Sequence, residues 1–242
     1  MTNNKLLNTF IFILLLTKSL LAISSQDFIN NSDCNQIIDK TFITICYDYN
    51  LKAPKAVSYT LQGDLVNEVN IEKRPYFKVE KTIDPNYRAS YSDYTNNGKN
   101  LDRGHLAPDA SFDWSQESLD AVYTLANIIP QARKVNRYTW TKAERYARFI
   151  AVSLGEVNVI NVVKYATNPT RIGKHGIAVP SGYYKVLYST DQTYTKCLYY
   201  ANDNNITTSE DRLRSHEIDC NELVPVKKDY SFLIPVLMMI NQ

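Results

Sequence analysis

Four consecutive residues, Asp102-Arg103-Gly104-His105, combine groups that are suited to chemistry on a phosphate ester. A neutral imidazole takes a proton from water near pH 7, so His105 suits the role of a general base. The guanidinium of Arg103 can hold a phosphate through two parallel hydrogen bonds. For a lone histidine, however, a structural role beside an ion pair is the more common case. Whether this segment is catalytic therefore depends on what the rest of the chain places beside it.

A second group of polar residues lies on a segment that we expect to be helical, from about residue 136 to residue 154. Asn136 and Glu144 would lie roughly 80° apart around such a helix and two turns along it, so both can face one cleft. The amide oxygen of an asparagine is a hard ligand that suits Mg²⁺, which keeps most of its waters in proteins. An asparagine at the start of a helix is more often a cap, and this alternative stays open.

The same segment is basic and carries interleaved aromatic residues. Its basic members, opposed only by Glu144, are Arg133, Lys134, Arg137, Lys142, Arg145 and Arg148, and its aromatic members are Tyr138, Trp140 and Tyr146. Basic side chains contact phosphates without reading the sequence of bases, and aromatic stacking is equally tolerant. We therefore assign substrate binding to Arg133, Arg137, Lys142 and Arg145. The alternative is a helix face that is merely solvated.

The order of these motifs resembles a known family. Asp-Arg-Gly-His, then the run from Asn127 to Gln131, then the helix that begins at Asn136 resemble the DNA/RNA non-specific endonucleases, the Serratia-nuclease-like group with a ββα-metal site. The resemblance implies an α+β fold in which the long metal-binding helix packs on a central, mainly antiparallel sheet. It also implies hydrolysis of DNA and RNA without sequence specificity, 5′-phosphorylated products, and a cofactor such as Mg²⁺ or Mn²⁺.

The resemblance also implies a role for individual residues. His105 would activate the attacking water, Asn136 would be the one direct protein ligand of the metal ion, and Glu144 would orient the waters of that ion. Three further residues have matching positions, with Arg103 near the scissile phosphate, Asn127 supporting the geometry of the site and Arg74 stabilising phosphate charge. A homodimer is compatible with the family, but no interface can be recognised in the sequence.

The pattern of apolar residues predicts the elements that carry these groups. Strands are expected at residues 41–49, 57–61, 157–165, 177–179 and 183–188, with a terminal strand at 232–240. The last two internal strands are expected to pair across residues 180–182. Ser115 is a suitable N-cap for a short helix towards Tyr123, residues 84–100 are expected to be a loop, and residues 128–130 interrupt the pattern. This mixture, with one long helix, also indicates an α+β fold.

The N-terminus predicts export. Lys5, an apolar run at residues 10–16 and small residues near position 24 are typical of a secretory signal peptide over residues 1–24, followed by a single nuclease domain over residues 25–242. The alternative is an uncleaved membrane anchor. Removal of residues 1–24 would lower the formal net charge from +2 to 0. Any attraction to a polyanion would then depend on a local basic patch. We expect a secreted or periplasmic protein without stable membrane association.

The four cysteines agree with an oxidising compartment, where disulfides persist. Three pairings are possible, and we favour the local one, which joins Cys34 to Cys46 and Cys197 to Cys220. A zinc site is the alternative, but the chain has no Cys-x-x-Cys spacing or histidine pair that supports one.

Three functions are compatible with these features. The leading hypothesis is a metal-dependent endonuclease acting on both DNA and RNA, and a nuclease of the same site type restricted to DNA is the second. The third, from a different class, is a secreted nucleic-acid-binding protein with an inactive site. The presence of Arg103, His105, Asn136 and Glu144 together favours the enzymes over the binding protein.

Overall fold

The computed structural model describes residues 25, 29, 33–95 and 97–223. Its main element is a seven-stranded sheet in the order β1-β2-β3-β6-β9-β10-β11, and all neighbouring strands are antiparallel. The strands are β1 Gln36–Asp39, β2 Ile43–Asp48, β3 Ala53–Gln62, β6 Glu156–Lys164, β9 Gly182–Tyr188, β10 Thr195–Ala201 and β11 Glu217–Ile218. The expected α+β fold with a mainly antiparallel sheet is confirmed. The expected signal peptide and the strand at 232–240 lie outside the described residues.

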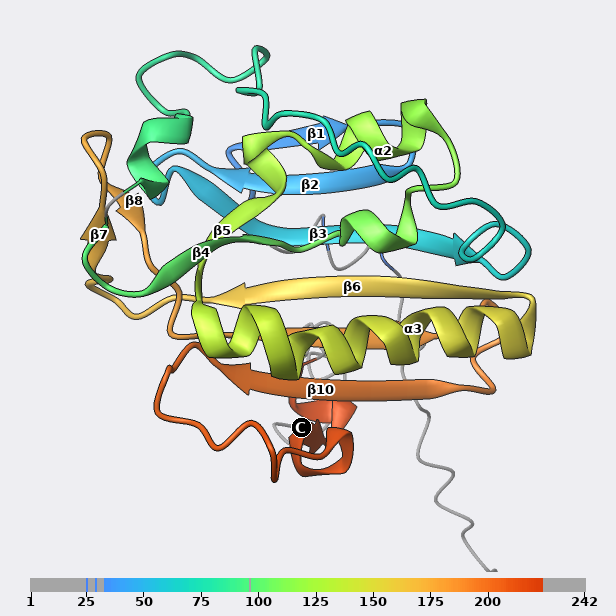
Figure 1. Ribbon diagram of the computed structural model, residues 1–242. Helices are drawn as coiled ribbons and strands as arrows, with labels where there is room; N and C mark the ends of the chain where they lie inside the picture. The colour runs from blue at the N-terminus through green and yellow to red at the C-terminus, as the bar shows by residue number, and fades with distance from the viewer. Residues whose placement is uncertain (1–24, 26–28, 30–32, 96, 224–242) are drawn as a thin grey trace, which may run out of the picture.

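The long helix α3 (Trp140–Leu154) packs along one face of this sheet (Figure 1). Its buried residues, Trp140, Ala143, Ala147, Ile150 and Ala151, recur at intervals of three, four and one, which places them on one stripe of the helix. The small alanines let the helix approach β6, whose Val157 and Val159 are fully buried and share a core cluster with the α3 residues. The helix ends at Gly155, whose φ of 87° disfavours other residues.

The first turn of the predicted helix differs from the expectation. A π-helical turn, η4 (Val135–Thr139), precedes α3. Asn136 lies within this turn rather than at a cap, because the N-cap position belongs to Lys134. The capping alternative for Asn136 is therefore wrong. A π turn is wider than an α turn, and such turns are frequent at functional sites.

Two strands outside the main sheet were not expected from the sequence. Strand β4 (Leu101–His105) pairs antiparallel with β5 (Ile128–Ala132), so residues 128–130 continue a strand instead of interrupting one. Pro130 fits because β5 has only β4 as a neighbour and can lack one donor. In Figure 1 this pair lies at the end where α3 begins. Between the strands, α2 (Gln116–Val122) is capped as predicted, because the Ser115 side chain accepts from the Ser118 N–H.

The pairing predicted for residues 177–179 and 183–188 is wrong. Strand β8 (Ile177–Ala178) pairs with β7 (Arg171–Ile172) in a separate hairpin, whereas β9 lies between β6 and β10. The hairpin turns back through Gly173 and Gly176, both with positive φ. The remaining short elements are the 3₁₀ helices η1 Tyr91–Tyr94, η2 Asp109–Ser111, η3 Leu125–Asn127, η5 Leu213–His216 and η6 Cys220–Glu222.

Two disulfides join segments outside the strands to the sheet. Cys34 is bonded to Cys46 in β2, and Cys197 in β10 is bonded to Cys220. The local pairing predicted from the sequence is confirmed. No helix among the described residues is long and apolar enough to cross a membrane.

Gly104 generates a prediction about the β4–β5 pair. A Cβ atom at position 104 would overlap the fully buried side chain of Gln131. We expect Gly104→Ala to separate the strands, to cost about 1–3 kcal/mol of unfolding free energy through overpacking, and to reduce nuclease activity. Gly155→Ala is the matched control, because it strains the distal end of α3 and should lower stability without changing the activity of the folded protein. Equal activities of the two variants would contradict this prediction.

Candidate active site

Asp102 and Asn136 form the contact at the centre of the site. The Asn136 Nδ2 donates to Asp102 Oδ2 over 3.2 Å. Asp102 also accepts from Arg137 through two hydrogen bonds of 2.7 and 3.0 Å and forms an ion pair with Arg133. Although burial opposes ionisation, the bonds from Arg137 and Asn136 hold the pKa of Asp102 below its usual value. The Asp102 carboxylate therefore orients the side-chain amide of Asn136, with the amide nitrogen directed at Asp102.

His105 ends β4 in an aromatic enclosure. Its ring lies 5.2 Å from that of Phe77 and 5.0 Å from that of Tyr123. The Nε2 atom is buried, and no described residue forms a hydrogen bond with the ring. Burial lowers the pKa of His105 to about 4, with Asp109 opposing the shift and Arg74 adding to it. The imidazole is therefore neutral at physiological pH, the state that a general base requires.

Glu144 lies on the next turn of α3 after Trp140. Burial raises the pKa of Glu144 to about 7, against the attraction of Lys185 and Arg148. The carboxylate forms no ion pair or hydrogen bond with any described residue. It is thus an acceptor that is enclosed by the protein but remains available to waters.

Arg103 stacks on aromatic rings instead of pairing with an acid. Its guanidinium carbon lies 4.1 Å from the ring centre of Tyr91 and 5.7 Å from that of Phe77. None of its nitrogens forms a hydrogen bond or ion pair with a described residue, so all its donors can reach a phosphate. A cavity of about 490 Å³ opens beside it, and Tyr91, Arg103, Arg133 and Arg137 are among its lining residues. This cavity is the most basic one described.

Arg74 is placed near the site but is already paired. It forms ion pairs with Asp109 at 3.3 Å and with Asp113 at 2.9 Å. Asp109 also accepts from the hydroxyl of Tyr123 at 2.9 Å. Arg74 influences His105 electrostatically. Its charge is partly balanced by these acids, which weakens the role in phosphate stabilisation implied by the family resemblance.

Asn127 is fully buried and binds the segment that follows His105. Its amide donates to Ala107 O and Val122 O and accepts from Ala107 N, each over 2.9 Å. Its own carbonyl accepts from Leu106 N at 3.0 Å. Three of these bonds hold Leu106 and Ala107, which follow β4, and the fourth holds Val122 at the end of α2. The arrangement agrees with the supporting role expected for Asn127.

Two members of the basic, aromatic segment differ from their predicted roles. Lys142 donates to the Asp211 carboxylate and to the Asp211 carbonyl, both at 2.9 Å, so its charge is used within the protein. Trp140 is fully buried and cannot stack on a base. Tertiary contacts cause both differences, because Trp140 packs against Tyr183 and Tyr200 and Lys142 is paired with Asp211. Arg145 is exposed, as are Arg133 and Arg137.

Two charged residues beside the site were missed in the sequence. Arg148 acts electrostatically on Glu144 and donates from Nη1 to Ser111 Oγ at 3.3 Å. Its position one turn after Glu144 on a helix is a signal that could have singled it out from the basic run. Asp109 carries no local motif. Only the fold places it between Arg74 and His105.

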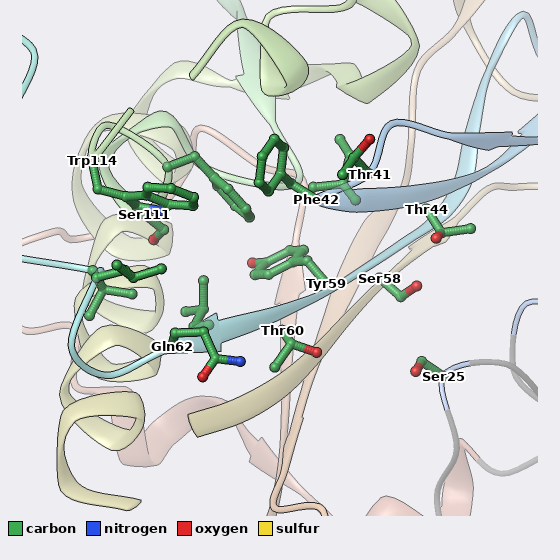
Figure 2. A pocket seen from close by; sticks show the side chains of 15 residues that line it. Ser25, Thr41, Phe42, Thr44, Ser58, Tyr59, Thr60, Gln62, Ser111 and Trp114 are labelled. Carbon is green, nitrogen blue, oxygen red and sulfur yellow. The ribbon is translucent and has the colours of Figure 1, made fainter. Parts of the chain in front are cut away.

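A different cavity, of about 390 Å³, lies where β2 and β3 meet the segment around Trp114 (Figure 2). Phe42, Tyr59 and Trp114 face it, and none of its described lining residues carries a charge. Such a cavity offers hydroxyl and amide donors but no cation to a phosphate. The basic cavity beside Arg103 is therefore the better candidate for the substrate.

The residues fit a divalent cation held by one amide. Because the Asn136 Nδ2 is bound to Asp102, the Asn136 Oδ1 is the free end of the amide, and no described residue donates to it. In the described part of the chain, no cluster of three His, Cys, Asp or Glu side chains provides an alternative metal site. An ion with a single protein ligand retains most of its waters, which is how Mg²⁺ commonly binds. Glu144 is an available acceptor for such waters.

Comparison with known proteins agrees with this architecture. The profile of the DNA/RNA non-specific endonuclease family matches residues 25–236. The chain belongs to this family. A solved structure of an EndoG/EndoGI complex has the same fold, with a TM-score of 0.69 and 22% identity over 77% of this chain and 81% of that chain.

Among curated relatives, human "Endonuclease G, mitochondrial" is 28% identical over 166 residues, which are 63% of this chain and 54% of that protein. The "Mitochondrial nuclease" of Saccharomyces cerevisiae is 26% identical, over 61% of this chain and 49% of that protein. A "Nuclease" of Nostoc sp. is 25% identical, over 65% and 56%. The chain spans about half the length of the curated relatives it matches.

The lowered pKa of His105 predicts a pH dependence of stability. Between its ordinary value of 6.5 and about 4, the unfolded histidine binds a proton that the folded one does not. The contribution of His105 to stability should therefore fall as the pH decreases through this range, by on the order of 2 kcal/mol. Glu144, whose pKa is raised to about 7, contributes with the opposite sign, so the effect of His105 is the difference between the wild-type protein and a His105 variant. Denaturant unfolding at pH 7 and pH 4.5 measures the loss. It should be smaller in His105→Gln, and an identical loss in both proteins would show that His105 is not enclosed.

Proposed function

We propose that this protein is a secreted, divalent-metal-dependent endonuclease that hydrolyses phosphodiester bonds of DNA and RNA without sequence specificity. The observation that carries the proposal is the Asp102–Asn136 hydrogen bond of 3.2 Å, which leaves the amide oxygen of Asn136 free at the strand that ends in His105. Family membership supports the nuclease activity. The named relatives include mitochondrial proteins, whereas the two disulfides and the apolar N-terminus support export for this chain.

In the proposed reaction, neutral His105 accepts a proton from water as the water oxygen attacks phosphorus. Arg103 binds the phosphate and balances the charge that develops on it, with Arg74 adding a smaller effect. Asn136 would hold the cation, and Glu144 would orient its waters. When bound, a divalent cation supplies Lewis acidity that stabilises the departing oxygen. The bond from phosphorus to the 3′ oxygen breaks and the departing oxygen takes a proton from solvent water, which leaves a 5′-phosphate and a 3′-hydroxyl.

The substrate would lie across the basic cavity beside Arg103. Arg133 and Arg137 are half exposed there, and each shares the carboxylate of Asp102. Arg145 extends the exposed positive charge along α3. Contacts of this kind recognise the backbone of the nucleic acid and carry no information about its bases. Exposed Tyr138 and Tyr91 offer rings on which bases can stack.

A cleavage assay on DNA and on RNA, with and without EDTA, tests the proposal. We expect both substrates to be cut and EDTA to abolish cutting, with recovery on addition of excess Mg²⁺ or Mn²⁺. Cleavage of DNA alone would indicate the restricted nuclease. Binding without cleavage would indicate a nucleic-acid-binding protein, and cleavage that resists EDTA would refute the role of Asn136 as a metal ligand.

Substitution of His105 tests the general base. His105→Ala should lower the cleavage rate by about 10²–10⁴-fold, the contribution usual for a positioned acid or base, while affinity for nucleic acid stays within a few-fold. His216→Gln is the control, because His216 packs on Tyr200 and Asp211 instead of at the site, and it should retain activity. Near-normal activity of His105→Ala would exclude His105 as the base.

A further inference from the structure

Lys185 is a buried lysine whose charge the proposed reaction does not use. It lies in β9, is fully inaccessible to solvent, and has no carboxylate within ion-pair distance among the described residues. Its Nζ donates to Asn161 Oδ1 at 2.8 Å and lies 4.3 Å from the ring centre of Trp140. Burying an ammonium group costs several kcal/mol unless its surroundings compensate it. A function for this charge is therefore expected.

The first connection leads from Lys185 to the catalytic strand. Asn161 in β6 is the direct cross-strand partner of Lys185. Its Oδ1 accepts from Lys185, and its Nδ2 donates to Leu106 O at 2.7 Å and to the Tyr59 hydroxyl at 3.1 Å. Leu106 follows His105 directly. The lysine thus fixes the orientation of an amide that holds the backbone beside the proposed general base.

The second connection leads to α3. Trp140 begins this helix, and its ring lies between Lys185 and two tyrosines, Tyr183 and Tyr200. Glu144, one turn further, receives its largest stabilising charge interaction from Lys185. The effect is mutual, since burial lowers the pKa of Lys185 to about 7 and Glu144 opposes the shift.

The other charged and titratable groups around this pair come from four elements, one of which is β10, whose Tyr200 is influenced by the charge of Glu144. Arg148 on α3 disfavours a charge on Lys185 and favours one on Glu144. Asp109 opposes ionisation of Glu144, and Arg145 favours it. The Tyr59 hydroxyl on β3 lies 3.5 Å from the Lys185 Nζ. Lys185 is the only one of the cations that approaches Glu144 from the sheet, beneath the helix.

We propose that Lys185 is a positioning residue of the active site, which aligns His105 through Asn161 and Leu106 and provides a cationic side chain beneath the first turns of α3, which carry Glu144. This inference rests on the proposed roles of His105 and Glu144. Lys185 would support the reacting groups from the interior of the protein, without contact with water or nucleic acid. Groups of this kind typically change rates 10–100-fold through the residues they orient.

Lys185→Met tests the inference, because methionine keeps much of the volume and removes the charge. In the full-length oxidised protein we expect kcat to fall at least about tenfold with little change in KM. The acidic limb of the kcat–pH profile should move upwards by about one pH unit, because Glu144 loses a favourable cation. Lys164→Met, at the exposed end of β6, is the matched control and should leave both quantities unchanged. Unchanged kcat and pH profile in folded Lys185→Met would overturn the proposal.

A measurement on the unmodified protein covers the case in which Lys185→Met does not fold. The ¹³C shift of the Glu144 carboxyl and the ¹⁵N shift of the Lys185 Nζ are followed by NMR from pH 5 to pH 9. We expect the chemical shift of each group to change also at the pH where the other group titrates. If each shift changed only with its own titration, the proposal would be refuted. Because this readout needs no catalysis, it also separates failure of the Lys185 inference from failure of the proposed nuclease function.

Discussion

Strand β4 pairs with β5 outside the seven-stranded sheet, and this short ladder sets Asp102 opposite Gln131 and His105 opposite Ile128. The chain leaves β5 directly into the π turn η4, which returns Asn136 to Asp102 at the start of the same ladder. The Asp102–Asn136 contact and the position of His105 both follow from this register. A shift by one residue would turn Asp102 and His105 to the opposite faces of β4. The absence of a side chain at Gly104 lets the strands close over Gln131.

Charge compensation is the second constraint on the site. Asp102 is balanced by Arg133 and Arg137, and Asp109 by Arg74. These pairs leave Arg103 without an acidic partner, and burial keeps His105 neutral. Donors and acceptors are thus oriented before a substrate arrives, which is the arrangement that stabilises a charged transition state most efficiently. Glu144 is also compensated by cations, which are Arg145 and Arg148 on α3 and Lys185 on β9.

Much of the architecture could be predicted from the sequence because it depends on local patterns. Apolar residues alternate with polar ones in β2, form runs in β3 and β6, and lie along one side of α3. Each pattern reflects the burial of a single segment. The disulfides join cysteines that are near in sequence. The strands β4 and β5 were missed, because Pro130 and the polar run before His105 resemble loops until the two segments meet.

The sequence by itself determined the family and the order of the motifs, and it proposed Arg103, His105, Asn136 and Glu144 as candidate reacting groups, since residue type and spacing are properties of the chain. Only the tertiary structure decided which charged side chains remain free to contact a substrate. Lys142 is paired with Asp211, 69 residues further along the chain. Arg148 interacts electrostatically with Glu144 and so contributes to the site. Burial lowers the pKa of His105, and a lysine of β9 lies beneath α3. The physical reason is that desolvation and pairing depend on neighbours brought together by packing, and spacing along one segment does not encode them.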